Sequence, residues 1–258
     1  MNWIHALILG IVEGVTEFLP ISSTGHLILA ARLLNLPSTD FSKSFAVAIQ
    51  LGAILSVVVL YWRSLMTDSA VIKRVILAFA PTAVLGFLLY KIIKKFLLGN
   101  AVVVLWALFI GGLCLILFEL FHREKGDAAS EVSSISYSQA FMIGLFQSLA
   151  VIPGVSRAAA TIIGGLILGL RRKTIVEFSF VLAVPTMAAA VALDLARSAA
   201  GFSSGQFLLL AGGFIVSFIV ALAAIKALLY YIQRNNFIIF GAYRMAAALL
   251  FWFIFFKR

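Results

Sequence analysis

Charged residues are scarce in this sequence. Of its 258 residues only 12% are charged, against about 25% in soluble domains, while 63% are hydrophobic and the mean hydropathy is +1.12. A chain of this composition cannot cover itself with polar side chains in water. The composition therefore excludes a soluble enzyme and predicts an all-α polytopic membrane protein.

Cysteine is nearly absent as well. The single residue, Cys114, lies in an apolar run, so no intramolecular disulfide can form and the chain carries no sign of its redox compartment. The N-terminus lacks the basic region and the small-residue cleavage site of a signal peptide. We therefore expect the first apolar segment to stay in the mature protein.

Acidic residues are half as frequent as basic ones, 10 against 20, which gives a formal net charge of +10. The basic residues lie in small groups between apolar runs, such as the group at 171–173 and the group at 91–95. This pattern is typical of loops that anchor membrane helices to lipid. No basic groove interleaved with aromatic residues is visible, so we expect membrane lipid as a partner and no nucleic acid.

One polar stretch interrupts the first apolar segment: EGVTEFLPISSTGH, residues 13–26. Glu13 and Glu17 are four residues apart, so on a helix both carboxylates project from one face. An ionisable group at hydrocarbon depth costs on the order of a few kcal/mol, and two of them indicate a functional site. The alternative is a solvated helix end.

The same stretch predicts a re-entrant hairpin. Residues 3–18 would reach only roughly 24 Å as a helix, short of a hydrocarbon core of roughly 30 Å, and Pro20 then ends the helix. A second short apolar piece, 24–34, follows the turn. The alternative is one kinked span over 3–34, but this length far exceeds the roughly 20 residues that a span needs.

The rest of the chain contains six full-length apolar segments and a second short pair. A hydrophilic stretch at 122–139 separates the two halves, so we expect a single membrane domain, 1–258, with a first repeat at 1–121, a polar linker at 122–139 and a second repeat at 140–258. The second hairpin is expected at 140–170, and the spans at 44–62, 73–90, 101–120, 176–194, 206–227 and 237–256.

The two halves resemble each other in sequence. The motif GIVE before the first turn returns as GLFQ before the second, and Pro20 and Pro153 are 133 residues apart. The same offset aligns the apolar segments that begin at Ser44 and Glu177. Since a hairpin returns to its own side, each half crosses the membrane three times, and the halves must be inverted repeats whose hairpin tips meet inside the membrane.

Both tips carry residues that suit an anion. Ser22, Ser23 and Thr24 precede one short helix, and Gly154 and Ser156 precede the other, so free N–H groups and the positive dipole ends point into the turns. Phosphate is the anion that such sites commonly bind. The predicted substrate-binding residues are Ser22, Thr24, Gly25, Gln147, Gly154, Ser156 and Thr161.

Ionisable groups complete this predicted site. Arg157 supplies a planar fork that matches phosphate oxygens, and His26 supplies a titratable ring beside the hydroxyl of Ser23. The predicted catalytic residues are thus Glu13, Glu17, Ser23, His26 and Arg157. The simpler alternatives are capping for Ser22, Thr24 and Ser156, a carbonyl contact for the histidine and snorkelling for the arginine. For Glu119, Asp194 and Arg197, at segment ends, we expect only solvation.

The motifs EGVTEFLPISSTGHL and PGVSRAAAT, with AIQLGAI and YRMAAA, resemble those of the undecaprenyl-diphosphate phosphatase family of the bacitracin-resistance type. The resemblance covers essentially the whole chain. It implies an enzyme of the bacterial cytoplasmic membrane that hydrolyses undecaprenyl diphosphate to the monophosphate and phosphate, recycling the carrier for cell-wall peptidoglycan synthesis. It also implies catalytic roles for the five residues above. Ala158-Ala159 departs from the Ser-Gly that the family often has, so no phosphate contact is expected from position 158.

The sign of each side chain's charge predicts its role toward a negatively charged diphosphate. Arg157 and the helix N-termini would hold the phosphates of a polyprenyl diphosphate lipid, whereas Glu13 and Glu17 would hold a divalent cation, Mg²⁺ or Ca²⁺, or one would act as a base. Either Ser23 or His26 is the nucleophile, or His26 protonates the leaving group. A lipid flippase or ion-coupled transporter is the alternative function, because inverted repeats suit transport as well. A homodimer is a further expectation.

Overall fold

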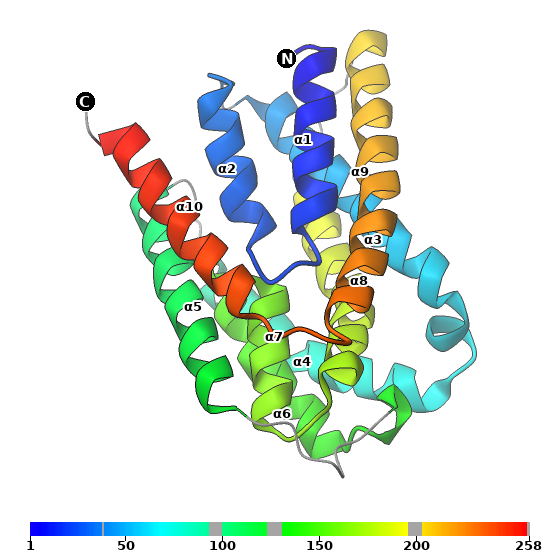
Figure 1. The fold of residues 1–258 in the computed structure, drawn as a ribbon. Helices are drawn as coiled ribbons and strands as arrows, with labels where there is room; N and C mark the ends of the chain where they lie inside the picture. Colours follow the sequence, from blue (N-terminus) through cyan, green and yellow to red (C-terminus); the bar gives the residue numbers. More distant parts are fainter. Residues whose placement is uncertain (38, 93–99, 123–130, 196–202, 257–258) are drawn as a thin grey trace.

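The chain folds into a bundle of α-helices (Figure 1). The computed structural model describes residues 1–256 apart from 38, 93–99, 123–130 and 196–202. Within these residues there are ten α-helices, two short 3-10 helices and no strand. The elements in chain order are α1 (Trp3–Thr16), α2 (Ser23–Leu33), α3 (Asp40–Met66), α4 (Ser69–Ile92), α5 (Ala101–Phe121), η2 (Val132–Ser134), α6 (Tyr137–Ser148), η3 (Leu149–Val151), α7 (Arg157–Ile167), α8 (Arg172–Leu195), α9 (Ser204–Tyr231) and α10 (Ile238–Phe256).

Six of the described helices are long and apolar enough to cross a membrane: α3, α4, α5, α8, α9 and α10. They coincide with the six predicted spans, and only the last of these spans begins one residue before its helix. The prediction of an all-α polytopic membrane protein is therefore confirmed. The N-terminus and the C-terminal end of α10 lie at the same end of the bundle (Figure 1).

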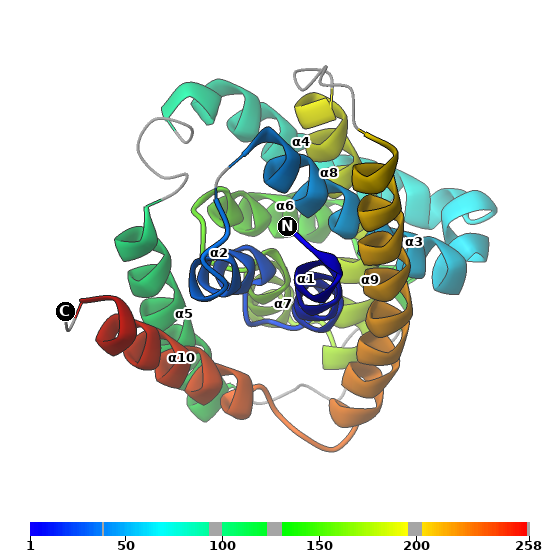
Figure 2. The ribbon, with the colours of Figure 1, turned by 90° about the horizontal axis from the view of Figure 1, so that it is seen from above.

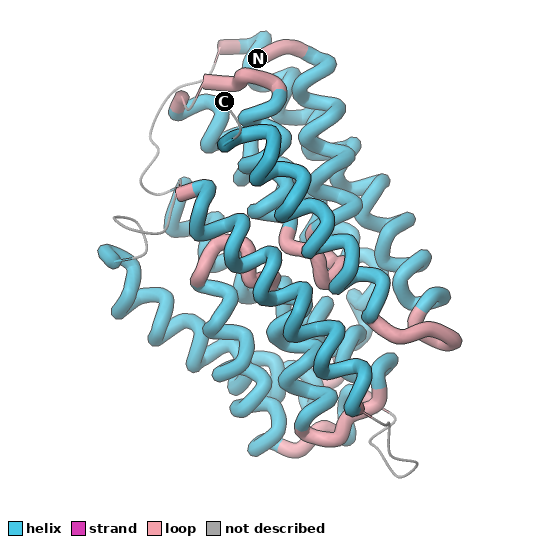
Figure 3. The backbone as a smooth tube through the Cα atoms, turned by 60° about the vertical axis from the view of Figure 1, so that its left-hand side comes forward, coloured by secondary structure: helices cyan, strands magenta, loops and turns pink. Residues whose placement is uncertain are grey.

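The four shorter helices lie at the centre of the bundle. Seen from above, α1, α2, α6 and α7 are surrounded by the six long helices (Figure 2). The 14 residues of α1 rise only about 21 Å at 1.5 Å per residue. The turns that join α1 to α2 and η3 to α7 lie at mid-height, where Figure 3 shows loop segments inside the bundle as well as at its ends.

Serine begins the second helix of each short pair. Ser22 caps α2 and Ser156 caps α7, and their φ values are +73° and +75°. Positive φ is costly for residues other than glycine and is found mainly where surrounding structure enforces it, often at functional sites. The two turns thus share one strained conformation, although their sequences differ.

The two pairs of short helices, α1–α2 and α6–α7, share backbone features that recur at one constant separation in the sequence. Capping boxes begin α1 at Asn2 and α6 at Ser136, and positive φ follows α2 at Asn35 and α7 at Gly169. The members of each pair of positions are 134 residues apart. This differs by one residue from the offset that aligns the two turn prolines, so the turns themselves are not matched residue by residue.

The two halves of the chain interlock. Helix α1 packs on α9, whereas its counterpart α6 packs on α4. Small residues allow this close contact: a Cβ atom added at Gly10 would lie 2.9 Å from the carbonyl oxygen of Gly213, and one at Gly14 would lie 2.7 Å from that of Ser217. Such small-residue contacts are typical of membrane helix pairs. Each short pair is therefore held by a long helix of the other half.

The largest apolar core lies beneath the first turn, between that turn and helices α3, α4, α7 and α8. Phe18, in the turn, packs edge-to-face on Phe180 of α8 with ring centroids 5.4 Å apart. Both side chains are fully buried. This contact fixes the position of the residue before Phe18, which is Glu17.

The prediction that solvation explains Glu119 is wrong. Glu119 is only 6% exposed, pairs with Arg172 at 2.8 Å and accepts a hydrogen bond from the backbone N–H of Phe237 at 3.3 Å. The start of α8 and the connection between α9 and α10 thus cover this end of α5, which position along the chain does not reveal. The side chains of Asp194 and Arg197 lie outside the described residues.

The predicted linker, 122–139, is described only in part, because 123–130 lie outside the described residues. Its last residues are more ordered than predicted: η2 occupies Val132–Ser134, and α6 begins at Tyr137 rather than at 140. Ser136 and Gln139 form a capping box, which starts the helix before the apolar run.

Candidate active site

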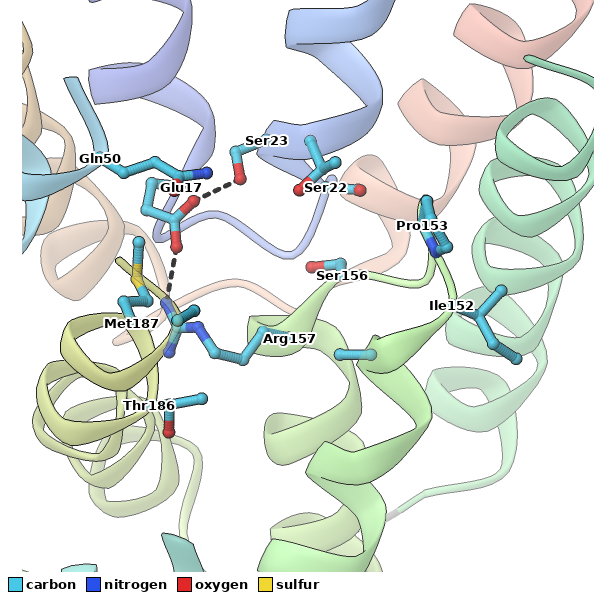
Figure 4. A pocket seen from close by; sticks show the side chains of 14 residues that line it. Glu17, Ser22, Ser23, Gln50, Ile152, Pro153, Ser156, Arg157, Thr186 and Met187 are labelled. Atoms are coloured by element: carbon cyan, nitrogen blue, oxygen red, sulfur yellow. Dashed lines mark hydrogen bonds and ion pairs between the residues drawn. The ribbon is translucent and has the colours of Figure 1, made fainter. Parts of the chain in front are cut away.

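A pocket of about 220 Å³ lies where the two turns meet (Figure 4). It is smaller than the roughly 300–1,000 Å³ of pockets that enclose a whole drug-sized ligand. A pocket of this size suits a small polar head group rather than an entire lipid. Its polar lining comes from both turns and from α3 and α8: Glu17, Ser22, Ser23, Thr24, Gln50, Ser156, Arg157 and Thr186, with the backbone of Gly154.

Glu17 is the centre of the polar contacts in this pocket. One carboxylate oxygen, Oε2, accepts a short hydrogen bond from Oγ of Ser23, and the other, Oε1, accepts one from Nη2 of Arg157 at 3.1 Å. Glu17 comes from the end of α1, and Arg157 from the start of α7. Three of the five predicted catalytic residues are therefore in direct contact, with one carboxylate between a hydroxyl and a guanidinium (Figure 4).

Arg157 is held through two of its three nitrogen atoms, Nη2 by Glu17 and Nη1 by α8. Its Nη1 donates to the backbone oxygen of Ser179 on α8 at 2.9 Å, and its Nε is buried with no partner among the described residues. The side chain is 11% exposed. Nε is shielded in this arrangement, so the Nε–Nη2 edge can donate two parallel hydrogen bonds to a phosphate group only after Nη2 leaves Glu17 and the edge turns toward the pocket.

The N-termini of α2 and α7 both begin at the pocket. Ser22 Oγ accepts from the N–H of Gly25 at 3.4 Å, and Ser156 Oγ accepts from the N–H of Ala159 at 3.2 Å. Both serines thus cap a helix and line the pocket. Because the first amides of a helix lack carbonyl partners within it, each N-terminus offers donors and a positive dipole end to an anion.

His26 points away from this pocket and does not line it. Its Nδ1 lies 2.8 Å from the carbonyl oxygen of Ser22, and its Nε2 lies 2.9 Å from the hydroxyl of Tyr243 on α10. A carbonyl contact is what the simpler alternative for this histidine predicts. In this arrangement no hydrogen bond joins His26 to Ser23 among the described residues.

Glu13 is fully buried one turn before Glu17 and does not line the pocket. Neither of its carboxylate oxygens has a hydrogen-bond donor among the described residues. A buried carboxylate without donors is costly. Two free, hard oxygen atoms fit a divalent cation or a proton, although the described residues contain no group of three or more His, Cys, Asp or Glu that could hold a metal.

Three of the predicted substrate-binding residues lie behind the pocket wall. Gln147 is buried and donates from Nε2 to the hydroxyls of Thr82 at 2.8 Å and Thr186 at 3.3 Å. Thr161 contacts the hydroxyl of Ser179 at 2.6 Å. Gly25 faces apolar side chains of α5. The other four, Ser22, Thr24, Gly154 and Ser156, line the pocket.

Arg244 is a further residue of this region, to which the sequence analysis gave no role. It is fully buried on α10, and its guanidinium donates to the carbonyl oxygens of Pro20 at 3.2 Å and of Gly154 and Val155 at 3.0 Å each. A fourth bond reaches the carbonyl of Ala107 on α5 at 3.1 Å. One side chain therefore joins the two turns. The sequence does point to Arg244: it is an ionisable residue inside an apolar segment, which is the feature that identified Glu13 and Glu17.

Comparisons with known proteins agree on one family. Residues 6–250 match the model of the family described as bacitracin resistance protein BacA. The chain is 51% identical to the undecaprenyl-diphosphatase of Aquifex aeolicus (strain VF5), with 96% of each chain covered. It is also 51% identical to that of Sulfurihydrogenibium sp. (strain YO3AOP1), covering 98% of this chain and 99% of the relative. Against that of Campylobacter jejuni subsp. jejuni serotype O:23/36 (strain 81-176) the identity is 45%, covering 100% and 96%.

Proposed function

The chain belongs to the bacitracin resistance protein BacA family, and on this premise we propose that its pocket hydrolyses undecaprenyl diphosphate to undecaprenyl phosphate and phosphate. The protein is a multi-pass membrane phosphatase. Its relatives named above carry the phosphatase name, which favours the enzyme over the transporter alternative. The observation that carries the proposal is the contact of Glu17 with both Ser23 and Arg157.

Arg157 binds the terminal phosphate in this proposal. The free enzyme keeps Arg157 paired with Glu17, and an incoming diphosphate brings more negative charge than one carboxylate. The phosphate oxygens then take the Nε–Nη2 edge, while Nη1 stays on the carbonyl of Ser179. Binding thus frees one oxygen of Glu17, and the N-termini of α2 and α7 add donors for the charge that develops on the transferred group.

Ser23 is the nucleophile in this proposal. Its hydroxyl lines the pocket and donates to Glu17, whereas the Nε2 atom of His26 faces Tyr243. Glu17 takes the proton of Ser23 as Oγ bonds to the terminal phosphorus. The bridging P–O bond breaks, and undecaprenyl phosphate leaves with that bridging oxygen. Water then attacks the phosphorus of the phosphoserine, and the Oγ–P bond breaks as Glu17 returns its proton to Oγ. Phosphate departs with the oxygen and both hydrogens of the water, and the Ser23 hydroxyl and the Glu17 carboxylate are restored.

Glu13 is the residue that would hold a divalent cation, since its two oxygens lack donors, and Glu17 would share it. Mg²⁺ commonly takes one or two protein carboxylates and completes its shell with water and phosphate oxygens, so a set of two acids fits. Bound there, the ion would offset the negative charge of the diphosphate.

The fold proposal is two inverted repeats, each a re-entrant hairpin followed by three spans, in the bacterial cytoplasmic membrane. It is supported by the shared 134-residue spacing of caps and positive-φ positions and by the exchanged packing of α1 on α9 and α6 on α4. The turns at mid-height would then lie at the membrane midplane, where the lipid head enters sideways while its tail stays in lipid.

The test is phosphate release from a short-chain prenyl diphosphate by the purified protein in detergent. We expect stoichiometric prenyl phosphate and phosphate. A rapid-quench experiment with substrate labelled in the terminal phosphate should also trap label on Ser23. Turnover without any labelled protein intermediate would reject Ser23 as the nucleophile, and lack of turnover in the presence of Mg²⁺ and Ca²⁺ would reject the function.

A further inference from the structure

A chain of contacts runs from α10 to the start of α2. The hydroxyl of Tyr243 lies 2.9 Å from Nε2 of His26, and Nδ1 of the same ring lies 2.8 Å from the carbonyl oxygen of Ser22. Ser22 in turn caps α2 in its strained conformation, next to Ser23. Tyr243 is separated from His26 by 217 residues, so this contact depends wholly on the tertiary fold.

The carbonyl oxygen of Ser22, at one end of these contacts, determines which ring nitrogen of His26 carries the hydrogen. A carbonyl oxygen can only accept, so Nδ1 of His26 must carry a hydrogen. In the neutral ring Nε2 is then the lone-pair acceptor, and the Tyr243 hydroxyl donates to it. The rings of His26 and Tyr243 are also nearly parallel, with an interplanar angle of 9° and centroids 5.5 Å apart. The imidazole is therefore held in one tautomer and one orientation, with its lone pair occupied.

We propose that Tyr243 is a positioning residue for the phosphatase reaction: through His26 it fixes the carbonyl of Ser22 and thereby the place of Ser23 against Glu17. Its neighbour Arg244 holds the carbonyl of Pro20 in the same turn. The first turn is thus held from α10 at two points, Pro20 directly and Ser22 through His26, by two consecutive side chains. The kinetic part of this proposal rests on the proposed function, whereas the contact chain does not.

The ring nitrogens of His26 give a readout that a purely structural tyrosine would not move, because only Nε2 contacts the Tyr243 hydroxyl. The protein has only three histidines, His5, His26 and His122, so ¹⁵N labelling of histidine yields a simple spectrum in detergent. We expect the wild-type His26 signals to report the Nδ1–H tautomer, assigned by their loss in His26→Gln. In Tyr243→Phe we expect Nδ1 to keep its hydrogen on the carbonyl of Ser22, whereas the Nε2 signal should shift because its lone pair loses the hydroxyl donor; an unchanged Nε2 signal would reject the contact. A wild-type ring with the hydrogen on Nε2 would overturn the proposal without any variant.

A double-mutant cycle tests the same link through turnover. Tyr243→Phe keeps the ring but removes the hydroxyl, and we expect kcat to fall about tenfold, the effect of one lost hydrogen bond of ~1.4 kcal/mol, with KM unchanged within a factor of two. In the His26→Ala background the same substitution should have no further effect. The control is Tyr230→Phe, on the exposed face of α9, which should match the wild type.

Each outcome of the cycle is decisive. Independent, additive losses would mean that Tyr243 acts elsewhere, and an unchanged kcat in Tyr243→Phe would reject a positioning role. If the wild type itself releases no phosphate, the proposed function fails while the ¹⁵N spectrum still decides the Tyr243–His26 contact. If Tyr243→Phe does not fold, the wild-type spectrum remains the test.

Discussion

Arg157 donates to Glu17 at 3.1 Å across 140 residues of sequence. The two side chains come from the two halves of the chain, and both are nearly buried, at 11% and 6% exposure. Neither half alone contains the site, because Glu17 ends α1 in the first half and Arg157 begins α7 in the second. Interlocked halves therefore bring one carboxylate, one guanidinium and one hydroxyl into a single pocket.

The first prediction concerns this pair. Glu17→Gln and Arg157→Gln should each reduce phosphate release by at least about 100-fold, since each removes a charge that acts on the reacting group. Each should also destabilise the protein, by on the order of 3–5 kcal/mol, because the remaining buried charge loses its partner. Thermal unfolding in detergent and phosphate release measure the two effects separately.

The double variant Glu17→Gln/Arg157→Gln is the matched control. It removes both charges, so the melting temperature should recover toward the wild type while turnover stays absent. Turnover at the wild-type rate in either single variant would refute the assignment of the pair to the site.

The second prediction separates two adjacent serines. Ser23→Ala should abolish turnover, because it removes the hydroxyl that donates to Glu17. Ser22→Ala should mainly destabilise the fold, by about 1 kcal/mol, since Ser22 caps α2. The measurement is kcat together with thermal unfolding for both variants. A Ser23→Ala enzyme that keeps most of its kcat would leave His26 or water as the nucleophile.

The architecture could be read from the sequence because long apolar runs and short interrupted ones are unambiguous signals. Six spans and two short pairs were predicted close to their observed positions, and the GIVE and GLFQ motifs pointed to the repeat. The sequence contains two offsets: GIVE and GLFQ are 134 residues apart, the spacing at which the short helices recur, whereas the prolines of the turns are 133 apart. Spacing alone therefore did not decide how the halves match.

Contacts between distant segments were harder to predict. Glu17, Ser23 and Arg157 were identified because polar residues stood out in apolar surroundings, and they do meet. The same rule was not applied to Arg244, which joins the turns. The direction in which His26 points depends on Tyr243, a residue 217 positions away, and sequence spacing from Ser23 carries no information about it.

The third prediction tests Arg244 as the link between the turns. Arg244→Lys should lower stability by on the order of 3 kcal/mol, because a single ammonium cannot reach the carbonyls of both turns and buried acceptors lose charged donors. Turnover should fall with it. Gly111→Ala tests the same link without changing Arg244 itself. The added Cβ atom would lie 2.8 Å from Cζ of Arg244, so it should displace the guanidinium and lower stability and turnover as well.

Gly86→Ala is the control variant for Gly111→Ala. No atom lies within 4 Å of a Cβ added at Gly86, so this change should be neutral or stabilising by about 0.5–1 kcal/mol in a helix interior. Thermal unfolding and phosphate release of both alanine variants decide the matter. Equal behaviour of Gly111→Ala and Gly86→Ala would argue against a link through Arg244.

The fourth prediction concerns the cation. If Glu13 and Glu17 hold a divalent ion, excess EDTA should stop phosphate release, and added Mg²⁺ or Ca²⁺ should restore it. Glu13→Gln should retain more activity than Glu17→Gln but need a higher concentration of the ion. Full activity in EDTA would reject the metal role and assign the two acids to proton transfer.

The fifth prediction concerns the membrane topology and uses the single native cysteine. In a Cys114→Ala background, Asp40→Cys, Met66→Cys and Lys173→Cys each place one thiol on a well-exposed side chain near a helix end. An impermeant maleimide applied to either side of sealed membranes reports the location of each thiol, and a protease-sensitive tag reports that of the N-terminus.

A re-entrant first hairpin returns to the side from which it entered. The tag and Asp40→Cys should therefore react from one side of the membrane, and Met66→Cys, after one crossing by α3, from the other. Lys173→Cys should share the side of Met66→Cys, because α4 and α5 make two further crossings and the second hairpin returns. If residues 3–34 crossed as one span, the tag and Asp40→Cys would react from opposite sides. A second hairpin that crossed would bring Lys173→Cys to the side of Asp40→Cys, and the two turns could then not meet at the midplane from opposite faces.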